Sequence, residues 1–463
     1  MKDRDIMIAE KIAAAVADAG GRTFYVGGYV RDLLLGRENK DIDIEVHGIP
    51  VRTLEDILDR IGHRLMMGAS FGIMGLRHYD IDIAMPRSEK AVGRGHRDFE
   101  VSVDPFIGYE KAAERRDFTM NALMRDVLTG EILDFFGGTE DLRRGLIRHV
   151  SARTFAEDPL RVFRAAQFAA RFGFSVAPET TALAASMDCS ALSGERIMGE
   201  LEKALLKAGS PSVFFRELRK MDRLSDWFPE AEALIGVPQD PERHPEGDVW
   251  VHTMQVLDQA ALLRGEASRP LWFMLAALCH DFGKAVTTTV DGERIHAYGH
   301  EKKGLPLAER FLGRITTEVR LREYVLNMTE LHMEPNLKAG ANARAKSFMK
   351  MFDGSVCPED LLLLAKADAL GRQPADPGAG FSAGDYAETE ALLRNRLAEY
   401  RALMARPFLT GKDLLEAGME PGPMMGEALA YAHKLRLAGV PKELQLTQTL
   451  GYIRAAARDR DKK

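Results

Sequence analysis

Two aspartates, Asp41 and Asp43, follow a glycine-rich turn near the N-terminus. The segment around them has the pattern of a strand, so both side chains point to one face while the residue between them points to the core. Two carboxylates on one side repel each other unless a cation joins them, and oxygen ligands at this spacing suit Mg²⁺ together with substrate phosphates. Gly27 and Gly28 allow the turn to approach a triphosphate, and Arg31 can take its charge. The pattern indicates metal-dependent nucleotidyl transfer.

Further polar residues extend this group. Asp82, in the strand-like stretch YDIDIAM, supplies a third acidic side chain. Asp158, Arg161 and Arg164 recur at intervals of three, so within a helix they share one face. Such a carboxylate can accept from the exocyclic amine of cytosine or adenine while a guanidinium donates to ring acceptors, whereas uracil and guanine present a carbonyl to the carboxylate. The alternative is that Asp158 caps a helix ahead of Pro159 and that the arginines are surface charges.

A second group of residues has the composition of a metal site. The candidate ligands are His252, His280, Asp281 and Asp368. Imidazole combined with carboxylate suits a divalent transition metal and leaves positions for water and a phosphate ester. His300 and His332 could extend the site to a second metal, and Lys284 could steady a phosphate. For His252 taken alone, the alternative is a core or surface histidine that binds no metal.

The elements that position these residues change along the chain. Helical apolar spacing over 3–19 stops at Gly20–Gly21 and gives way to short β-prone runs, with one helix near 51–61 among them. The expected strands are 23–26, 42–46, 72–77 and 80–84, which together describe a small α/β domain. From about 110 to 240 the pattern is almost wholly helical, apart from a strand-like stretch near 132–135. The proline-rich stretches GVPQDPERHPEGD and GRQPADPGAGFSAGD mark boundaries, and the remainder is helical.

Composition sets limits on the class of protein. The chain has 463 residues, 46% hydrophobic and 29% charged, and a net charge of −6. No apolar run approaches the roughly 18 residues that span a bilayer and no signal-peptide core is present, so we expect a cytoplasmic protein without membrane contact. The net charge argues against coating of nucleic acid through the overall field but allows a local basic groove, for which the arginines between 143 and 171 are candidates. Cys189, Cys279 and Cys357 are expected to be reduced core residues.

Five ordered motifs carry a family resemblance. Besides the first glycine–aspartate stretch, they are ERRDFTMNAL, EDPLRVFRAAQFAARFGF, HPEGDVWVHTMQVLDQAA with LAALCHDFGK, and KADALGR. With these the chain resembles the class II tRNA nucleotidyltransferase and poly(A) polymerase family, specifically the bacterial CCA-adding enzymes with a fused HD domain. The resemblance covers most of the chain. It implies an α+β fold, in which a small polymerase β-like α/β head precedes a mainly α-helical body, a helical HD domain and a helical C-terminal tail.

The resemblance also implies domains and roles. The segments are a nucleotidyltransferase head over 1–135, a helical neck over 136–240 for base reading and RNA binding, an HD domain over 241–375 and a helical C-terminal region over 376–463. Asp41 and Asp43 would bind catalytic Mg²⁺, and the nucleotide contacts would come from Gly28, Arg31, Arg116, Arg161 and Arg164. The implied activity is addition of CCA, or part of it, to tRNA 3′ ends from CTP and ATP, alongside phosphohydrolase chemistry at an HD site that holds a divalent transition metal.

Alternatives to full CCA addition remain open within this family. A poly(A) polymerase is one, although the basic glycine-rich run expected after its first motif is replaced here by FGIMGLRHYDI. Enzymes that add only CC or only A are others; the stretch PRSEKAVGRGHRDFE, over 86–100, is expected to form a flexible loop that disfavours a CC-only enzyme. A different class would be an HD phosphohydrolase with a non-catalytic RNA-binding head. That reading requires a broken Asp-x-Asp motif, and the motif is intact.

Overall fold

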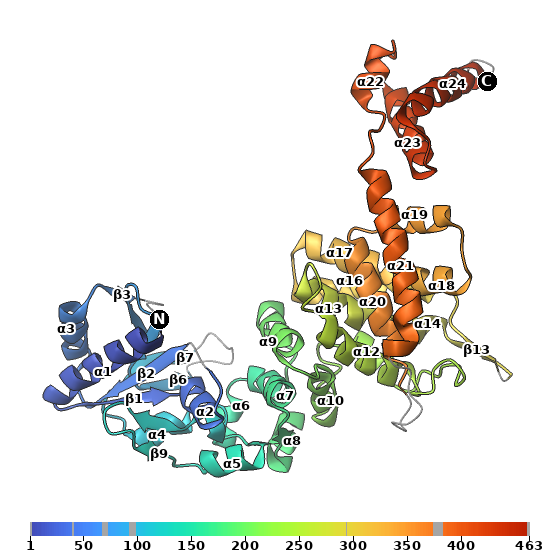
Figure 1. Cartoon of the computed structure of the whole chain (residues 1–463). Helices are drawn as coiled ribbons and strands as arrows, with labels where there is room; N and C mark the ends of the chain where they lie inside the picture. Colours follow the sequence, from blue (N-terminus) through green and yellow to red (C-terminus); the bar gives the residue numbers. More distant parts are fainter. Residues whose placement is uncertain are drawn as a thin grey trace. The chain divides into compact units, whose positions relative to one another are not determined.

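The computed structural model describes residues 2–38, 41–66, 73–91, 99–292, 294–373 and 383–460. Contacts divide the chain into two compact units, Met1–Trp227 and Phe228–Lys463, and each is described by itself. The first contains a sheet and a helical part, and the second is helical apart from one small ribbon (Figure 1). The expected α+β architecture is therefore confirmed, whereas the finer division into four segments stays a prediction.

A seven-stranded sheet organises the described part of the first unit. Its order is β3-β4-β5-β2-β1-β8-β9, in which β2 and β5 are parallel and the other neighbours antiparallel. The strands are β1 (Arg22–Val26), β2 (Ile42–His47), β3 (Arg64–Met66), β4 (Met74–Leu76), β5 (Ile81–Ala84), β8 (Met124–Asp126) and β9 (Ile132–Leu133). The expected strands near 23–26, 42–46, 72–77 and 80–84 are thus confirmed, with end shifts of a few residues.

The two faces of this sheet have different chemistry because side chains alternate along β2. Ile42 and Ile44 are buried on one face. The other face carries Asp43 and Glu45, and Glu45 lies opposite Phe24 of β1. Phe24 belongs to an apolar cluster with Ala113 of α4 (Tyr109–Glu114), so the acidic face of β2 is the face that α4 covers. Helix α1 (Lys2–Asp18) packs against β1, β2 and α3 (Val51–Ile61) on the other side (Figure 1).

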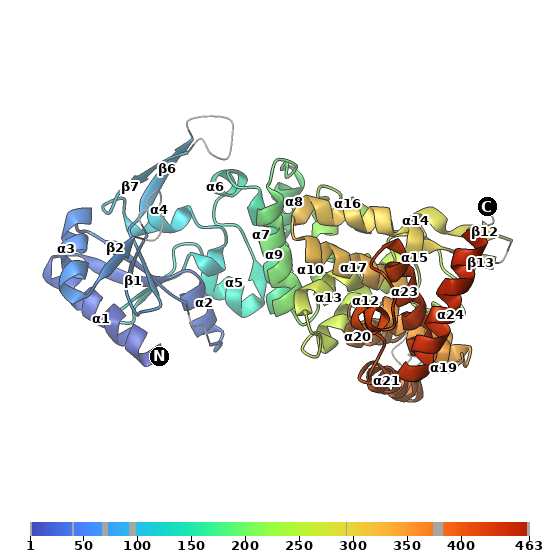
Figure 2. The same ribbon diagram turned by 90° about the horizontal axis from the view of Figure 1, so that it is seen from above.

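One expected loop is in part a β-ribbon. Residues 87–91 and 99–103 form antiparallel strands β6 (Arg87–Ala91) and β7 (Phe99–Val103), which extend away from the main sheet (Figure 2). The loop assignment is therefore wrong for these strands, because RSEKA and FEVSV pair as a two-stranded antiparallel ladder. Residues 92–98 of the same expected loop lie outside the described part of the chain.

Short helices complete the first unit and bring distant motifs together. Helix α7 packs against α9 and α10 and is apolar along its buried side. The remaining elements are α2 (Gly28–Leu34), η1 (Thr119–Asn121), α5 (Gly138–Arg144), β10 (Leu146–Ile147), α6 (Ala152–Ala156), α7 (Leu160–Phe172), β11 (Ser175–Val176), α8 (Pro178–Ala185), α9 (Gly194–Lys207) and α10 (Ser212–Lys220). The almost wholly helical pattern expected over about 110–240 is confirmed from α6 onward, where β11 is the one strand among the described residues. It is wrong for most of 115–151, where β8, β9 and β10 lie, and the strand-like stretch expected near 132–135 corresponds to β9.

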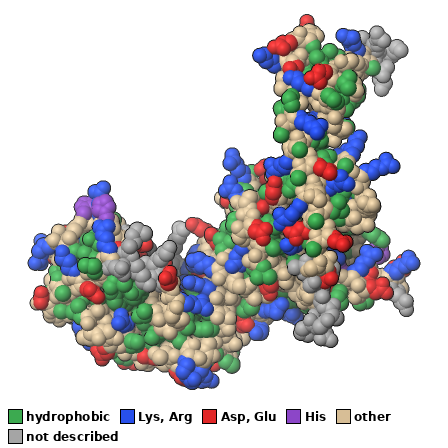
Figure 3. Space-filling view, viewed as in Figure 1, with side chains coloured by type: hydrophobic (Ala, Val, Ile, Leu, Met, Phe, Trp, Pro, Cys, Tyr) green, Lys and Arg blue, Asp and Glu red, His purple; other side chains and the backbone are tan. Residues whose placement is uncertain are grey.

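The second unit is built around α12 and α13, which pack against each other and against α20; α17 also packs on α13 and α20. Acidic and basic side chains are interspersed on its visible face (Figure 3). Its elements are α11 (Pro229–Glu232), α12 (Val249–Leu263), α13 (Pro270–Cys279), α14 (Lys284–Thr287), β12 (Thr289–Asp291), β13 (Arg294–His296), α15 (His300–Lys303), α16 (Leu305–Ile315), α17 (Val319–Leu331), α18 (Glu334–Gly340), α19 (Ala345–Gly354), α20 (Pro358–Leu370), α21 (Ala383–Met404), α22 (Gly411–Glu416), α23 (Pro423–Leu437) and α24 (Lys442–Arg460).

Two sequence expectations about the whole chain can be checked. Among the described residues, no helix has the length and apolarity needed to cross a membrane. All three cysteines are free: Cys189 and Cys279 are buried as expected, whereas Cys357 is only half-buried.

Candidate functional site

The acidic residues of the first unit gather where β2 and β5 begin. The strands run parallel with Asp43 directly opposite Asp82, and Asp41 immediately precedes β2. Burial and the neighbouring charge of Asp82 raise the pKa of Asp43 to about 6. Burial, Asp80 and Asp41 likewise raise the pKa of Asp82. A cation bound between these carboxylates would relieve their repulsion, and this donor set of oxygens fits Mg²⁺.

The glycine turn closes against this acidic group. Gly27, between β1 and α2, has a φ of 62°, a conformation that favours glycine. A Cβ at this position would lie 3.1 Å from Nη1 of Arg116 and 3.8 Å from Oδ2 of Asp43. The turn, an arginine and a metal-ligand candidate therefore meet at one place. Gly28 follows as the first residue of α2 and is half-buried.

A buried carboxylate that the sequence analysis missed organises the arginines. Glu45 Oε2 accepts from Nη2 of Arg115 at 3.1 Å and from Nη2 of Arg116 at 3.2 Å, and Oε1 lies 2.9 Å from Nε2 of His47. Although burial opposes the charge, the His47 hydrogen bond and the two arginines lower the pKa of Glu45 to about 2. The strand period offered a signal, because Glu45 follows Asp41 and Asp43 on the same face.

Arg31 lies inside the unit. The residue is only 4% exposed. Its Nε donates to Asp32 at 2.8 Å, its Nη1 donates to Asn121 at 2.8 Å, and the guanidinium lies over the rings of Phe168 and Phe172. These partners hold Arg31 beneath the glycine turn, and its contact with a triphosphate stays a prediction.

Hydrogen bonds continue from Arg31 to the EDPLR motif. Asn121 Nδ2 donates to Oδ1 of buried Asp117 at 2.9 Å, and Nε of Arg164 donates to the other Asp117 oxygen at 2.8 Å. Arg161 adds a second link, because its Nη2 donates 2.8 Å to the carbonyl oxygen of Arg115. The sequence motifs around Arg31, Arg116 and Arg164 are therefore joined into one polar network, although they lie far apart in the chain.

The proposed base-reading carboxylate is already paired. Asp158 lies two residues before the start of α7 at Leu160, so the premise that it shares a helix with Arg161 is wrong; Pro159, which has no N–H, separates it from the helix. Its Oδ1 accepts from the Leu160 N–H at 3.1 Å, and its Oδ2 lies 2.9 Å from Nη2 of Arg196. The side chain remains one-third exposed. Arg196, on α9, was not found from the sequence.

The second unit brings every expected histidine and aspartate ligand together in a buried cluster. His280 Nε2 lies 3.4 Å from His252 Nε2, and His252 Nε2 lies 3.1 Å from Asp368 Oδ1. His300 and His332 complete the cluster, with their Nε2 atoms 3.4 Å apart. All these side chains are at most about a tenth exposed.

Asp281 connects two halves of this cluster. Its Oδ2 lies 3.2 Å from His280 Nε2 and 3.6 Å from His252 Nε2. Its Oδ1 lies 3.2 Å from His300 Nε2 and 3.7 Å from His332 Nε2. With one oxygen beside each histidine pair, Asp281 could serve as a ligand to a cation on either side.

In three of these histidines, the hydrogen bond of Nδ1 determines that Nε2 is the nitrogen that can bind a metal. Nδ1 of His280 and of His300 each lies 2.8 Å from the carbonyl oxygen three residues earlier, and Nδ1 of His332 lies 2.7 Å from that of Thr329. An N–H at Nδ1 leaves Nε2 with a lone pair directed at Asp281. Burial lowers the pKa of His332 to about 3, so its ring is neutral. The donor set of imidazoles and carboxylates fits a divalent transition metal.

A lysine stands beside the bridging carboxylate. Lys284 Nζ lies 2.7 Å from Asp281 Oδ2 and donates to Oε1 of Gln239 at 2.8 Å. Both Asp281 oxygens are buried and lack a hydrogen bond of good geometry among the described residues. A cation would satisfy them, and the ammonium would lie next to any anion bound there.

Comparisons with known proteins agree with both regions. Residues 23–148 match the poly A polymerase head domain, and residues 249–373 match the HD domain. The multifunctional CCA protein of Nitrosococcus oceani is 37% identical over 88% of this chain and 94% of its own. That of Pasteurella multocida is 39% identical over 80% of this chain and 87% of its own.

Solved structures share the fold across almost the whole chain. The apo form II of a CCA-adding enzyme has a TM-score of 0.67 at 20% identity, and covers 98% of this chain and 96% of its own. The Thermotoga maritima CCA-adding enzyme complexed with tRNA has a TM-score of 0.61 at 21% identity, over 97% and 94% of the two chains. At this identity the likeness shows a common fold.

Proposed function

The chain belongs to the family of multifunctional CCA proteins, and from this premise we propose that it adds the CCA end to tRNA from CTP and ATP. We further propose that its HD domain hydrolyses phosphate esters at a separate metal site. Because tRNA is the proposed substrate, we place the protein in the cytoplasm. The poly(A), CC-only and A-only alternatives have no specific support in the structure.

One observation carries the proposal for the first site. Asp43 lies opposite Asp82 on a parallel strand, and it also lies beside the Gly27 turn and Arg116. This places oxygen ligands, a close backbone approach and a cationic side chain around one point. A nucleoside triphosphate with its metal is a ligand that needs all three.

The residues divide the transfer reaction between them. The 3′-hydroxyl of the RNA attacks the α-phosphorus of the nucleotide, and pyrophosphate leaves. Asp41 and Asp43 would hold Mg²⁺, which when bound supplies activation of the hydroxyl and stabilisation of the leaving group. Arg116, held by Glu45, binds triphosphate oxygens, and the Gly27–Gly28 turn admits the phosphates.

Base choice is assigned to the segment that begins α7. Arg161 donates to ring acceptors and Asp158 accepts from the exocyclic amine of cytosine or adenine. Because Arg196 and Asp158 are paired, the carboxylate is held in one orientation before the nucleotide arrives. Arg164 supports this segment through its bonds to Asp117.

The HD site is assigned hydrolysis of a phosphodiester or 2′,3′-cyclic phosphate. His252, His280, Asp281 and Asp368 would hold one transition metal, and His300 and His332 with Asp281 would hold a second. When bound, the metal supplies Lewis acidity and a water nucleophile at neutral pH. Lys284 lies where its ammonium can bind a phosphate oxygen.

Product lengths on defined tRNAs test the first activity. Transcripts that end before the first C, after the first C and after the second C are incubated with CTP, ATP or both, and the products are separated on a denaturing gel. We expect each transcript to stop at the complete CCA end when both nucleotides are present. Extension past this end with ATP alone would indicate a poly(A) polymerase, and extension that stops before the terminal A would indicate a CC-adding enzyme.

A further inference from the structure

One ligand histidine of the second unit is held differently from the other three. His280, His300 and His332 direct Nδ1 at main-chain carbonyls three residues earlier. For His280 and His332 these carbonyls belong to the last turn of a helix, and for His300 the carbonyl lies in the loop before α15. His252 lies inside α12, where carbonyls serve the helix itself. Its Nδ1 instead lies 2.7 Å from Oε1 of Glu246, a side chain from the preceding loop.

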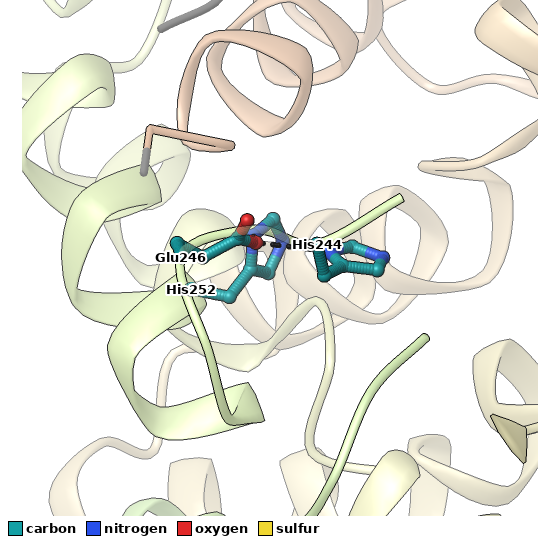
Figure 4. A group of neighbouring side chains, drawn as sticks. All are labelled: His244, Glu246 and His252. Carbon is teal, nitrogen blue, oxygen red and sulfur yellow. Dashed lines mark hydrogen bonds and ion pairs between the residues drawn. The ribbon is translucent and has the colours of Figure 1, made fainter. Parts of the chain in front are cut away.

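One carboxylate oxygen of Glu246 accepts hydrogen bonds from two histidine rings. The same Oε1 lies 2.8 Å from Nδ1 of His244, and the three side chains form one group (Figure 4). Because a carboxylate can only accept, both imidazoles carry their proton on Nδ1. Nε2 of His252 therefore keeps a lone pair that can bind a metal ion, and it lies 3.1 Å from Asp368 Oδ1 and 3.6 Å from Asp281 Oδ2.

The same three residues could be taken for an additional metal site, since their ligand atoms lie within 4.8 Å of one another. The separations from Oε1 to the two Nδ1 atoms are those of N–H···O hydrogen bonds between heavy atoms. His252 would also have to lose both ring protons in order to bind cations on each side. Hydrogen bonds explain the arrangement of these three side chains without requiring His252 to lose both ring protons.

The loop that carries Glu246 is fastened at both ends. The Gly236 N–H donates to Asp248 Oδ2 at 2.7 Å, and the Val249 N–H donates to the carbonyl of Val237 at 3.0 Å. The Glu246 side chain is fully buried. Its position relative to α12 is therefore set by the fold.

We propose that Glu246 is a positioning residue that fixes the tautomer and ring orientation of His252 for metal binding. This inference rests on the metal site of the proposed HD function and goes beyond it, because it assigns a role to a residue that is not a ligand. Loss of such an outer hydrogen bond is expected to weaken metal binding by about 10–100-fold.

The test is the metal affinity of the full-length protein. Metal-free wild type and variants are titrated with Co²⁺ against a competing chelator, and the visible spectrum of the bound Co²⁺ is recorded. We expect Glu246→Ala to weaken binding by about 10–100-fold and to change the spectrum. Glu246→Gln keeps an acceptor oxygen, so it should restore most of the affinity. Glu242→Ala, the same substitution at an exposed position of the same loop, should bind as the wild type does.

The outcomes distinguish failure of the positioning role of Glu246 from failure of the proposed HD function. Wild-type affinity and spectrum in Glu246→Ala would overturn the inference, as would a Gln variant that binds no better than the Ala variant. Absence of Co²⁺ binding by the wild type would overturn both the metal site and the inference. Tight binding without hydrolysis would remove the proposed HD activity, while the affinity series would still support the positioning role. Retained tRNA extension by each variant shows that the chain is folded.

Discussion

The two centres of this protein differ in how far the fold prepares them for a ligand. In the first unit Asp41 and Asp82 are exposed and Asp43 is half-buried. In the second unit the proposed ligands are buried, and three of the four histidines are fixed by main-chain carbonyls. The first centre has carboxylates that repel one another, whereas the second has donors whose orientation is already set.

This difference follows from what each centre would have to admit. A nucleotidyl transfer site receives the end of a long RNA and a fresh nucleotide in every cycle, so its metals can enter with the substrate. A buried imidazole and carboxylate site retains its metal, because the ligands need little reorganisation to bind it. The comparison predicts weak, exchangeable metal in the first unit and tightly held metal in the second.

The largest expected effect is on the acidic centre of the first unit, which we call the open centre because its carboxylates are exposed or half-buried. Asp43→Ala removes one of the two proposed Mg²⁺ ligands, so tRNA extension should fall to background while the fold is retained. Extension of a tRNA that lacks its CCA end, measured alongside circular dichroism, checks this. Asp56→Ala, at an exposed position of α3, is the matched control and should extend normally. A rate near that of the wild type in Asp43→Ala would show that the carboxylates are assigned wrongly.

Replacement of Asp281 should cause a comparable loss of activity that is confined to the buried histidine and aspartate site of the second unit, which we call the closed centre. Asp281→Asn keeps the size of the side chain but removes the charge that joins the two histidine pairs, so bound metal and hydrolysis of 2′,3′-cyclic phosphate should both drop at least about 100-fold. Elemental analysis and a phosphate-ester assay measure the two effects. Extension of tRNA should continue. A simultaneous loss of extension in a folded variant would contradict the independence of the centres.

A smaller effect is expected for base contacts. Arg161→Ala should weaken binding of CTP and ATP by about 1–3 kcal/mol, the range of a good bidentate base contact. Nucleotide dissociation constants provide the measurement, and Arg153→Ala, at an exposed position of α6, is the control. Loss of affinity for one nucleotide alone would mean that Arg161 does not read both bases.

In Asp158→Ala, the discrimination between CTP and UTP should change more than the rate of nucleotide addition. The carboxylate repels the carbonyl of uracil and guanine, so its removal should narrow the preference for CTP over UTP by roughly tenfold or more. Competition between CTP and UTP for the same tRNA gives the ratio. Unchanged discrimination in the folded variant would leave Asp158 as the cap of α7 and the partner of Arg196.

The smallest expected effect concerns Glu45. Glu45→Gln keeps the shape of the side chain but weakens its bonds to Arg115 and Arg116, so KM for the nucleotide should rise by about tenfold with little change in kcat. Steady-state kinetics with varied CTP separate the two parameters. An unchanged KM would show that the arginines hold their positions without this carboxylate.

The sequence was informative where local pattern decides structure. The strand that carries Asp43 and the helix over 51–61 follow from periodicity. The clustering of His252 with Asp281 and Asp368 was expected from the ligand types and from the family resemblance. The β6–β7 ribbon was missed because the whole stretch over 86–100 was assigned to a loop, although FEVSV alternates apolar and polar residues.

Long-range partners could not be predicted in this way. Arg196 pairs with Asp158 across 38 positions, and nothing in the local pattern of α9 marks it. Glu246 was hidden for a related reason, since its role depends on the fold of a loop and not on a helix face. By contrast, Glu45 continues the alternation of Asp41 and Asp43, so the strand period offered a signal for it that was not used.

The chain of hydrogen bonds from Arg31 through Asn121 and Asp117 to Arg164 has a consequence for folding. It fastens the helix after the glycine turn to α7, across the point after residue 135 where the head was expected to end. A cut there would leave Asp117 buried without its arginine, and an uncompensated buried charge is strongly destabilising. The sheet and α7 should therefore unfold in a single cooperative transition. For the same reason, we expect related proteins to keep or replace the two together.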